Sequence, residues 1–495
     1  MTERDAASQP RTIRNASRVG RLQFLADEQK RDIYLAALDI MGRVGMKVYH
    51  EEAKTMLLKA GCSLTPEDRV LMPRHLVEKA RLSVPAVVDV YDRGGDLAME
   101  LGGYNSYFGT GSDLMFTYDL ETGERRDSNL EDTRRAARLC DALPNIDFIM
   151  SSAHPKEVDP HNSYALCFQV MMESSTKPLV VTAENAGDLG VMVEIARALR
   201  GGADELRRKP YFVVYNEPIS PLEHPVESIE KLLLCADSGV PSIYSPAPLA
   251  GATAPITAAG HLAQGVAESL FGLVIHQLHR PGAPFLFGVG SAVLDMLTAQ
   301  SSYNDLGYLL GYMGLVEMAK WLDIPNWGNA GTSDSQVVDA QAGMEATQIT
   351  FLAMQAGSNL AHDVGYLDFG LTGSLEQIVI VDEFIAMNRR LLNGFQVDRD
   401  TLAVDAVAEV GPGGHYMTSD HTYRYMRDVQ WRPTILNRYG REKWEAEGSL
   451  DLAAKAGRKA RDILAKHEAP ALPDGLAAAT TELITAFVER SARVV

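Results

Sequence analysis

One stretch, residues 327–370, constrains the fold more than any other part of the chain. It opens with a short strand-like piece that ends in Gly-Thr-Ser-Asp at 331–334, and a segment with apolar residues at helical spacing follows. Gly357 stops that helix, and a second strand-like piece runs from Leu360 into a His-Asp pair at 362–363. This pattern predicts a strand–helix–strand unit with polar residues at the end of each strand. In parallel α/β folds, ligands bind at the carboxyl ends of the strands.

The same unit recurs along the chain, since strand-like pieces alternate with helix-length stretches between residues 104 and 400. The strand-like pieces are 106–109, 147–151, 178–182, 211–215, 241–244, 284–288, 326–330 and 360–364. The helical stretches are 130–143, 163–173, 186–200, 225–237, 259–278, 301–322 and 340–355. Eight such units over roughly 250 residues have the count and size of a (β/α)8 TIM barrel. An open, doubly wound sheet is the main alternative, and the even count favours closure.

The segments on either side of the barrel region have a different character. Residues 1–20 are polar and predict a disordered N-terminus, whereas 21–103 predict an α+β extension with two helices within 24–60 and a β-hairpin at 87–101. Residues 401–495 predict a C-terminal helical cap on the barrel of residues 104–400. Within this cap, Gly413-Gly414-His415 has a second interpretation as a turn that approaches the site, because glycine tolerates close contact.

Composition excludes several classes of protein. The net charge is −18, with 47 basic and 65 acidic residues and no Lys/Arg block, so a nucleic-acid partner is not expected. No run of 18 apolar residues and no apolar leader occur, which predicts a cytoplasmic protein without a membrane span. The four cysteines, Cys62, Cys140, Cys167 and Cys235, are far apart and form no CxxC pair, so buried free thiols are expected.

The segments that follow the predicted strands are rich in polar residues and glycine, which predicts one shared pocket at the barrel mouth. His154, Glu217 and His362 could form a metal site if the barrel brought them together. However, the chain has no HxH or HExxH spacing. We therefore expect no metal and interpret each histidine as a hydrogen-bonding group.

Aromatic residues also gather in or near the predicted strands. They are Tyr104, Tyr107, Phe108, Tyr215, Tyr244, Trp327 and Tyr366. A quaternary ammonium group has no N–H to donate, so a protein holds it by shape, charge and aromatic faces. Each aromatic taken singly also suits core packing. As a set around one mouth, they favour a methylated cationic ligand.

Several longer segments carry a resemblance to a known family. YFGTGSD, DALPNIDFIMSSAHP, GTSDSQVVDAQAGMEA, AHDVGYLDFG and a tail that begins EVGPGGHYMTSDHTYRYMRDVQWRPTILNRYG resemble the trimethylamine methyltransferase family of corrinoid-dependent methyltransferases. The resemblance covers residues 25–470 and implies a TIM barrel that moves a methyl group from an amine to the cobalt of a separate corrinoid protein. The chain has no D-x-H-x-x-G corrinoid signature, as expected if the corrinoid is carried by another polypeptide.

One departure from the family narrows the implied substrate. The archaeal trimethylamine enzymes carry a pyrrolysine, whose counterpart we expect near residues 332–336, and this chain has only ordinary residues there. It therefore resembles the non-pyrrolysine branch, whose substrates are quaternary amines such as glycine betaine. A quaternary nitrogen leaves as a neutral tertiary amine when its methyl group is removed, so no general acid is required. The enzyme's task is then to hold the cation and aim one methyl group.

The resemblance and the residues together give a set of site predictions. We assign catalytic roles to His362, Glu217 and Asp334 and contact with the corrinoid to His362, Gly331 and Gly365, with no covalently bound cofactor. The predicted substrate-binding residues are Tyr104, Phe108, Gly111, His154, Tyr215, Tyr244 and Tyr366. The expected partners are the quaternary amine and the corrinoid protein, and a homo-oligomer is expected. The alternatives are a betaine-binding protein without turnover and a metal-dependent barrel lyase or hydrolase.

Overall fold

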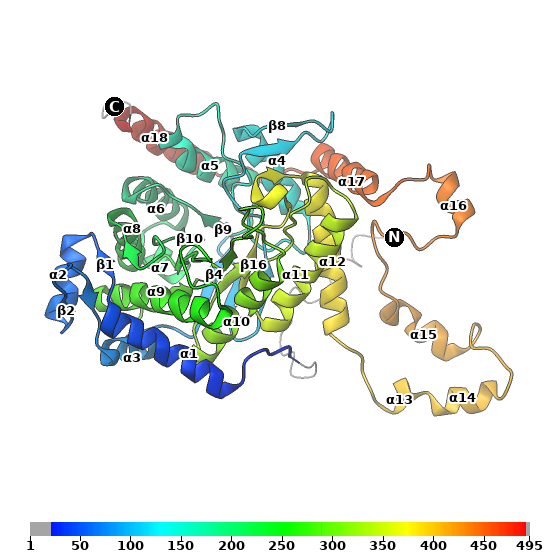
Figure 1. Cartoon of the computed structure of the whole chain (residues 1–495). Coiled ribbons are helices and arrows are strands. Elements are labelled where there is room, and N and C mark those ends of the chain that lie inside the picture. Colours follow the sequence, from blue (N-terminus) through cyan, green and yellow to red (C-terminus); the bar gives the residue numbers. More distant parts are fainter. Residues whose placement is uncertain (1–20, 289, 492–495) are drawn as a thin grey trace.

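The computed structural model describes residues 21–288 and 290–491 and is a mixed α/β fold (Figure 1). One parallel sheet has the order β14-β12-β10-β9, and a second has the order β16-β17-β6. Their bounds are β6 (Tyr107–Phe108), β9 (Leu179–Val181), β10 (Phe212–Asn216), β12 (Ser242–Tyr244), β14 (Phe285–Phe287), β16 (Trp327–Asn329) and β17 (Leu360–His362). The remaining predicted strand, 147–151, makes single bridges only. The α/β class is thus confirmed, but these strands form two sheets, so a closed barrel is not confirmed.

The predicted helices between the strands are confirmed. They are α4 (Leu130–Ala142), α5 (Pro160–Ser174), α6 (Ala186–Arg200), α8 (Val226–Ser238), α9 (Ala258–His279), α10 (Leu306–Leu322) and α11 (Ala340–Ala356), followed by α12 (Leu375–Leu392). The largest difference is at α10, which begins five residues later than the predicted 301. Asp305 caps this helix by accepting a hydrogen bond from the Gly307 N–H, so residues 301–305 belong to the preceding loop.

The central strand–helix–strand unit also has the predicted form. Asp339 caps the start of α11, and Gly357 ends it in the left-handed conformation with φ 76°. A Cβ at residue 357 would overlap the ring of Tyr104, so glycine suits both the turn and the close approach. The pairing of β16 with β17 places Asn329 beside His362.

Alternation along the strands separates two buried layers. Val213, Ile243, Leu286, Trp327 and Leu360 belong to one cluster between the strands. The antiparallel hairpin of β4 (Val87–Tyr91) and β5 (Leu97–Gly102), which confirms the predicted hairpin, packs into the same cluster. Residues on the other face of the strands join a larger cluster with the helices. Because both faces are buried, the strands do not alternate between apolar and polar residues.

Smaller elements complete the body. The predicted N-terminal helices are confirmed as α1 (Asp27–Asp39) and α2 (Glu51–Lys59). The others are η2 (Ile40–Val44), β1 (Lys47–Val48), β2 (Ser63–Leu64), β3 (Val70–Leu71), α3 (Arg74–Ser83), β7 (Phe116–Tyr118), β8 (Arg125–Asp127), α7 (Ala203–Arg208), β11 (Glu223–His224), β13 (Leu249–Ala250), β15 (Ala292–Val293), β18 (Tyr366–Leu367), η3 (Asp368–Gly370) and β19 (Thr372–Gly373). The four cysteines are free and buried, as predicted.

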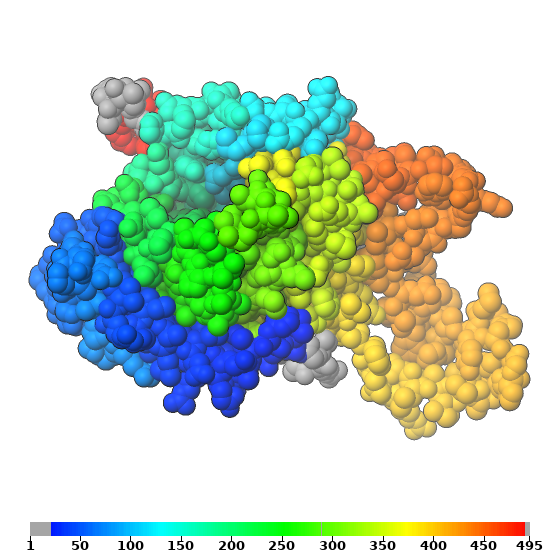
Figure 2. Space-filling model, in the orientation of Figure 1, coloured from blue at the N-terminus to red at the C-terminus, as the bar shows by residue number. Residues whose placement is uncertain are grey.

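The C-terminal region divides into two parts. Two helices, α17 (Leu452–Lys466) and α18 (Asp474–Ser491), pack on the body, α17 against α12 and α18 against α5 and α6. The segment before them carries α13 (Arg399–Leu402), α14 (Val404–Val410), α15 (Asp420–Val429) and α16 (Arg441–Ala446), and it projects away from the body in yellow and orange (Figures 1 and 2).

Two further predictions concern the ends of the chain and membranes. The disorder predicted for residues 1–20 lies outside the described residues. In the described part of the chain, one helix, α9, is long and apolar enough to cross a membrane, but 83% of its most apolar window is buried inside the protein. Burial in the core accounts for its composition.

Candidate functional site

Three aromatic rings from different strands meet between the strands. The ring of His362, at the end of β17, stacks on Trp327 of β16 with centroids 4.0 Å apart and an interplanar angle of 29°. The Tyr215 ring, near the end of β10, lies 5.7 Å from Trp327 and 6.4 Å from His362. Trp327 is 1% exposed, whereas Tyr215 and His362 remain partly accessible. The structure thus brings together residues of both parallel sheets in a partly open aromatic wall.

Hydrogen bonds fix the orientation of His362. Its Nδ1 lies 2.7 Å from the Gly328 carbonyl and donates to it, which leaves Nε2 as an acceptor 3.2 Å from Oδ1 of Asp363. Burial lowers the pKa of His362 to about 3 and raises the pKa of Asp363 to about 8. The raised pKa favours the protonated form of Asp363 beside a neutral imidazole at neutral pH.

The space around Asp363 is closely filled. Its other carboxyl oxygen accepts a hydrogen bond from the Asn329 side chain, and the neighbouring Tyr366 hydroxyl donates to the Ser112 carbonyl. A Cβ at Gly111 would overlap both the Tyr366 hydroxyl and the Asp363 carboxyl. Gly111 thus positions these two groups by leaving room for them.

A second carboxylate lies beside Tyr215. The Tyr215 hydroxyl donates to Oε2 of Glu217 at 3.0 Å. Glu217 is accessible to solvent, but the surrounding protein desolvates the carboxylate enough to raise its pKa. Tyr303 lies close by: desolvation raises the pKa of its hydroxyl, and the charges of Asp363, Glu217 and Asp334 raise it further. The aromatic wall therefore has acidic groups near it.

Asp334 positions the loop that carries Tyr303. Its carboxylate accepts hydrogen bonds from the backbone N–H groups of Tyr303 at 3.0 Å and Asn304 at 3.3 Å, and from the Ser302 hydroxyl. The Asp334 N–H in turn donates to Glu345 at 2.9 Å. Both carboxylate oxygens are thus engaged in holding this loop.

Two of the predicted aromatic residues face the helices. The Tyr244 hydroxyl lies 2.6 Å from Nδ1 of His224, and the Tyr244 ring lies against Gly272 of α9. Phe108 is fully buried, with the Arg389 guanidinium 5.5 Å from its ring centroid. Neither ring is brought to the aromatic wall, because each lies on the outward-facing side of its strand.

Tyr104 and His154 also lie apart from the three rings. Tyr104 contacts Gly357, which precedes β17, and the Arg21 guanidinium lies 4.1 Å from its ring centroid. It is therefore at the amino end of the strands, opposite His362. His154 lies near Asp113, with Nδ1 3.9 Å from Oδ1, and that carboxylate raises its pKa.

A model of a known protein family matches almost the whole chain. The family model for trimethylamine methyltransferase (MTTB) matches residues 1–494. The chain belongs to the MTTB family. Its methyltransferase class is thereby established at the level of the family.

Relatives of this MTTB-family chain carry two kinds of name. A trimethylamine methyltransferase MttB of Desulfitobacterium hafniense (strain DSM 10664 / DCB-2) is 29% identical, over 94% of this chain and 93% of the relative. A glycine betaine methyltransferase of D. hafniense (strain Y51) is also 29% identical, over 91% and 94%. The solved monomethylamine methyltransferase (MtmB) of Methanosarcina barkeri has a TM-score of 0.53 at 12% identity and covers 90% of this chain and 88% of its own, which shows a likeness of fold.

The sequence offers possible metal ligands in this MTTB-family protein and predicts that two of its glycines contact the corrinoid. Among the described residues, no group of three or more His, Cys, Asp or Glu side chains is arranged to hold a metal ion, so His154, Glu217 and His362 do not form such a set. A Cβ at Gly331 would meet Val381 of α12, and one at Gly365 would meet Ile378 of the same helix. These two glycines permit close packing on α12, and the His362 ring remains partly accessible.

Sequence reasoning missed two contributors to the site. Trp327 stood among the aromatic residues near strands but had no signal that separated it from core packing. Tyr303 lies in a loop before α10, where no periodicity marks a buried side chain. Only its place next to three acidic groups reveals it.

Proposed function

We propose that this MTTB-family methyltransferase is a cytoplasmic enzyme that takes a methyl group from a quaternary amine, glycine betaine or a similar betaine, and passes it to the corrinoid of a separate protein. The observation that carries the proposal is the aromatic wall of Tyr215, Trp327 and His362 with the carboxyl groups of Glu217 and Asp363 beside it. Aromatic faces and negative charge are what a protein can offer to a cation without N–H groups. A relative named for glycine betaine supports this choice of substrate.

Each residue then has a role that its contacts suggest. Tyr215 offers a ring face to the ammonium group, the buried Trp327 packs behind it, and Glu217, held by the Tyr215 hydroxyl, supplies negative charge. His362 is a neutral positioning group, since Gly328 and Asp363 engage both of its nitrogens. Asp363 becomes ionised when a cation lies near it. The corrinoid, when present, supplies the cobalt that accepts the methyl group.

The closed barrel belongs to the same proposal. Single backbone bridges join Gly109 to Phe148, Ile149 to Leu179, and Phe287 to Asn326, all parallel. These bridges link the two parallel sheets through the 147–151 segment on one side and directly on the other. They support a ring of eight strands, whose carboxyl ends would share one mouth.

Titration calorimetry with glycine betaine, tetramethylammonium and trimethylamine tests the substrate class. We expect glycine betaine to bind at least about tenfold more tightly than trimethylamine, a difference of about 1.4 kcal/mol. Methyl transfer from glycine betaine to cob(I)alamin should follow the same preference. Equal or tighter binding of trimethylamine would overturn the quaternary-amine assignment.

Two substitutions locate the binding site. Tyr215→Leu should weaken binding of the preferred cation, whereas Tyr104→Leu, at the opposite end of the strands, should leave it unchanged. If both substitutions weaken binding equally, the aromatic wall is not the binding site. Binding of a betaine without any methyl transfer to cob(I)alamin would favour a binding protein over an enzyme.

A further inference from the structure

Residues 393–450, which we term the arm, leave the body between α12 and α17 (Figure 1). Both of its ends are fixed, because α12 and α17 pack against each other. Thr434 adds to this anchor by donating its backbone N–H and its hydroxyl to Glu383, each at 2.6 Å. Within the arm, all of which the structure describes, only Ile435 is buried.

The arm exposes many large apolar side chains. They include Phe395 at 85%, Val397 at 66%, Val404 at 69%, Met417 at 86% and Tyr423 at 75% exposure. The arm helices are capped, for example by Asp398 and Ser419, but none exceeds ten residues. Isolated helices of this length are marginal in water, so these apolar surfaces need a covering surface.

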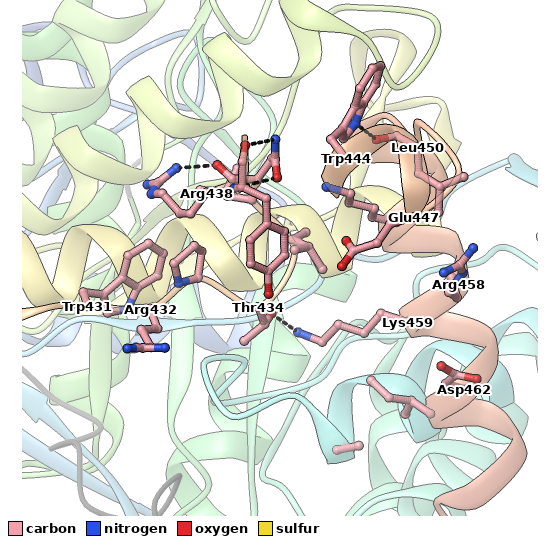
Figure 3. Close-up of a pocket in the computed structure, with 18 of the residues that line it drawn as sticks. Trp431, Arg432, Thr434, Arg438, Trp444, Glu447, Leu450, Arg458, Lys459 and Asp462 are labelled. Carbon is pink, nitrogen blue, oxygen red and sulfur yellow. Dashed lines mark hydrogen bonds between the residues drawn. The ribbon is translucent and has the colours of Figure 1, made fainter. Parts of the chain in front are cut away.

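The base of the arm forms a groove with α17. Its volume is about 1270 Å³, and Figure 3 shows Trp431, Trp444 and several basic side chains around it. The basic lining residues are Arg432, Arg438, Lys455, Arg458, Lys459 and Lys466. Two acidic side chains, Glu447 and Asp462, also line it. A groove with an excess of basic residues contrasts with the net charge of −18 of the whole chain.

The tip of the arm has the opposite character. The segment of α13 and α14 carries Asp398, Asp400, Asp405 and Glu409 against one basic residue, Arg399. Apolar side chains such as Val404 lie exposed beside these acids. In Figure 1 this tip lies at the far end of the arm from α17, so the tip does not fill the groove of its own chain.

We propose that the acidic, apolar tip of one copy packs into the basic, aromatic groove of a second copy, and that the second copy returns the same contact. Both halves of the charge match are present on one chain, which favours a second copy over an unrelated partner. A two-fold axis makes such a contact self-complementary. The exchange covers the exposed apolar side chains of the tip that the body of the same chain leaves open.

Sedimentation of the full chain over a range of concentrations tests this exchange. A tip variant, Asp405→Lys with Glu409→Lys, and a groove variant, Arg438→Glu with Arg458→Glu, each reverse one side of the match. We expect wild type to be oligomeric and each variant to dissociate at least about tenfold more readily, since several charge pairs become repulsive. A chain that carries all four substitutions should recover association.

A matched control reverses two exposed acids at the same spacing on another helix, Glu28→Lys with Asp32→Lys of α1, and should associate as wild type does. Circular dichroism shows whether each variant is folded. A monomeric wild type at all concentrations overturns the proposal, as does an oligomer that neither variant weakens. Failure of the fourfold variant to recover association overturns the pairing of tip with groove.

Discussion

The strand ends and the arm use similar side chains in opposite ways. At the strand ends, Tyr215 and His362 each have a hydrogen-bond partner and a neighbouring ring, and Trp327 is 1% exposed. In the arm, Met417 and Tyr423 are 86% and 75% exposed. Both regions are rich in aromatic and apolar residues, so residue type alone does not separate a pocket from an interface. What separates them is whether the same chain supplies the neighbours.

The largest expected effect is the loss of stability caused by a substitution in the strand-end region. Trp327→Ala removes a fully buried ring that packs on His362, Tyr215 and Phe148. A cavity of this kind should lower the free energy of unfolding by about 3–5 kcal/mol. Denaturant titration measures this loss. A loss below about 1 kcal/mol would mean that the strand ends are no better packed than the arm.

The next effect separates the two faces of one sheet. Tyr215→Leu removes a ring face from the aromatic wall and should weaken cation binding by about 2 kcal/mol, or roughly thirtyfold, with a smaller change in stability. Tyr244→Leu leaves His224 without its hydroxyl partner and should instead lower stability by about 1–3 kcal/mol. Calorimetric titration and thermal unfolding of both variants distinguish the faces. Equal loss of cation affinity in both would contradict the assignment.

The sequence predicted the elements well and the directions of side chains poorly, for a physical reason. Strands and helices carry local signals, such as the Gly357 stop, and these were confirmed. Tyr215 and Tyr244 look equivalent in sequence, but the register pairs Tyr244 with Asn216, so their rings lie on opposite faces. With both faces apolar, no alternation reveals which face is inward.

The barrel and the arm show what local signals leave out. Whether the eight predicted strands close into one ring depends on pairings between segments far apart in the chain, such as Phe287 with Asn326. Most of the arm lies within the predicted C-terminal cap, and its helices have good capping residues, for example Ser419. Capping predicts a helix but does not say what covers it.

A smaller effect concerns pH. Asp363 has a folded-state pKa of about 8, raised by burial, against about 3.9 in an unfolded chain. Between these values the folded protein holds a proton that the unfolded chain has lost, so stability falls as pH rises. The slope reaches about 1.4 kcal/mol per pH unit for one proton. Asp363→Asn should remove this contribution while it keeps an N–H donor for His362.

Denaturant titration of both proteins from about pH 4.5 to 7.5 measures the difference. The titration of His362, whose pKa is lowered to about 3, works in the opposite direction, because it makes the folded protein less stable as pH falls. It is present in both proteins and cancels in the comparison. Parallel profiles for wild type and Asp363→Asn would show that Asp363 is already ionised in the folded protein. The aromatic wall would then be open to water, as the arm is.

The smallest effect tests the arm itself. Tyr423 is 75% exposed, whereas Ile435, at 5%, is the one buried residue of the arm. Within a single chain, Tyr423→Ser should change the free energy of unfolding by less than about 0.5 kcal/mol, whereas Ile435→Ser should cost about 2–4 kcal/mol. Both substitutions should be made in the groove variant, Arg438→Glu with Arg458→Glu. Otherwise association between copies would stabilise one of the two proteins more than the other. If Tyr423→Ser costs as much as Ile435→Ser in that background, the arm is packed within its own chain. The contrast between strand ends and arm would then fail.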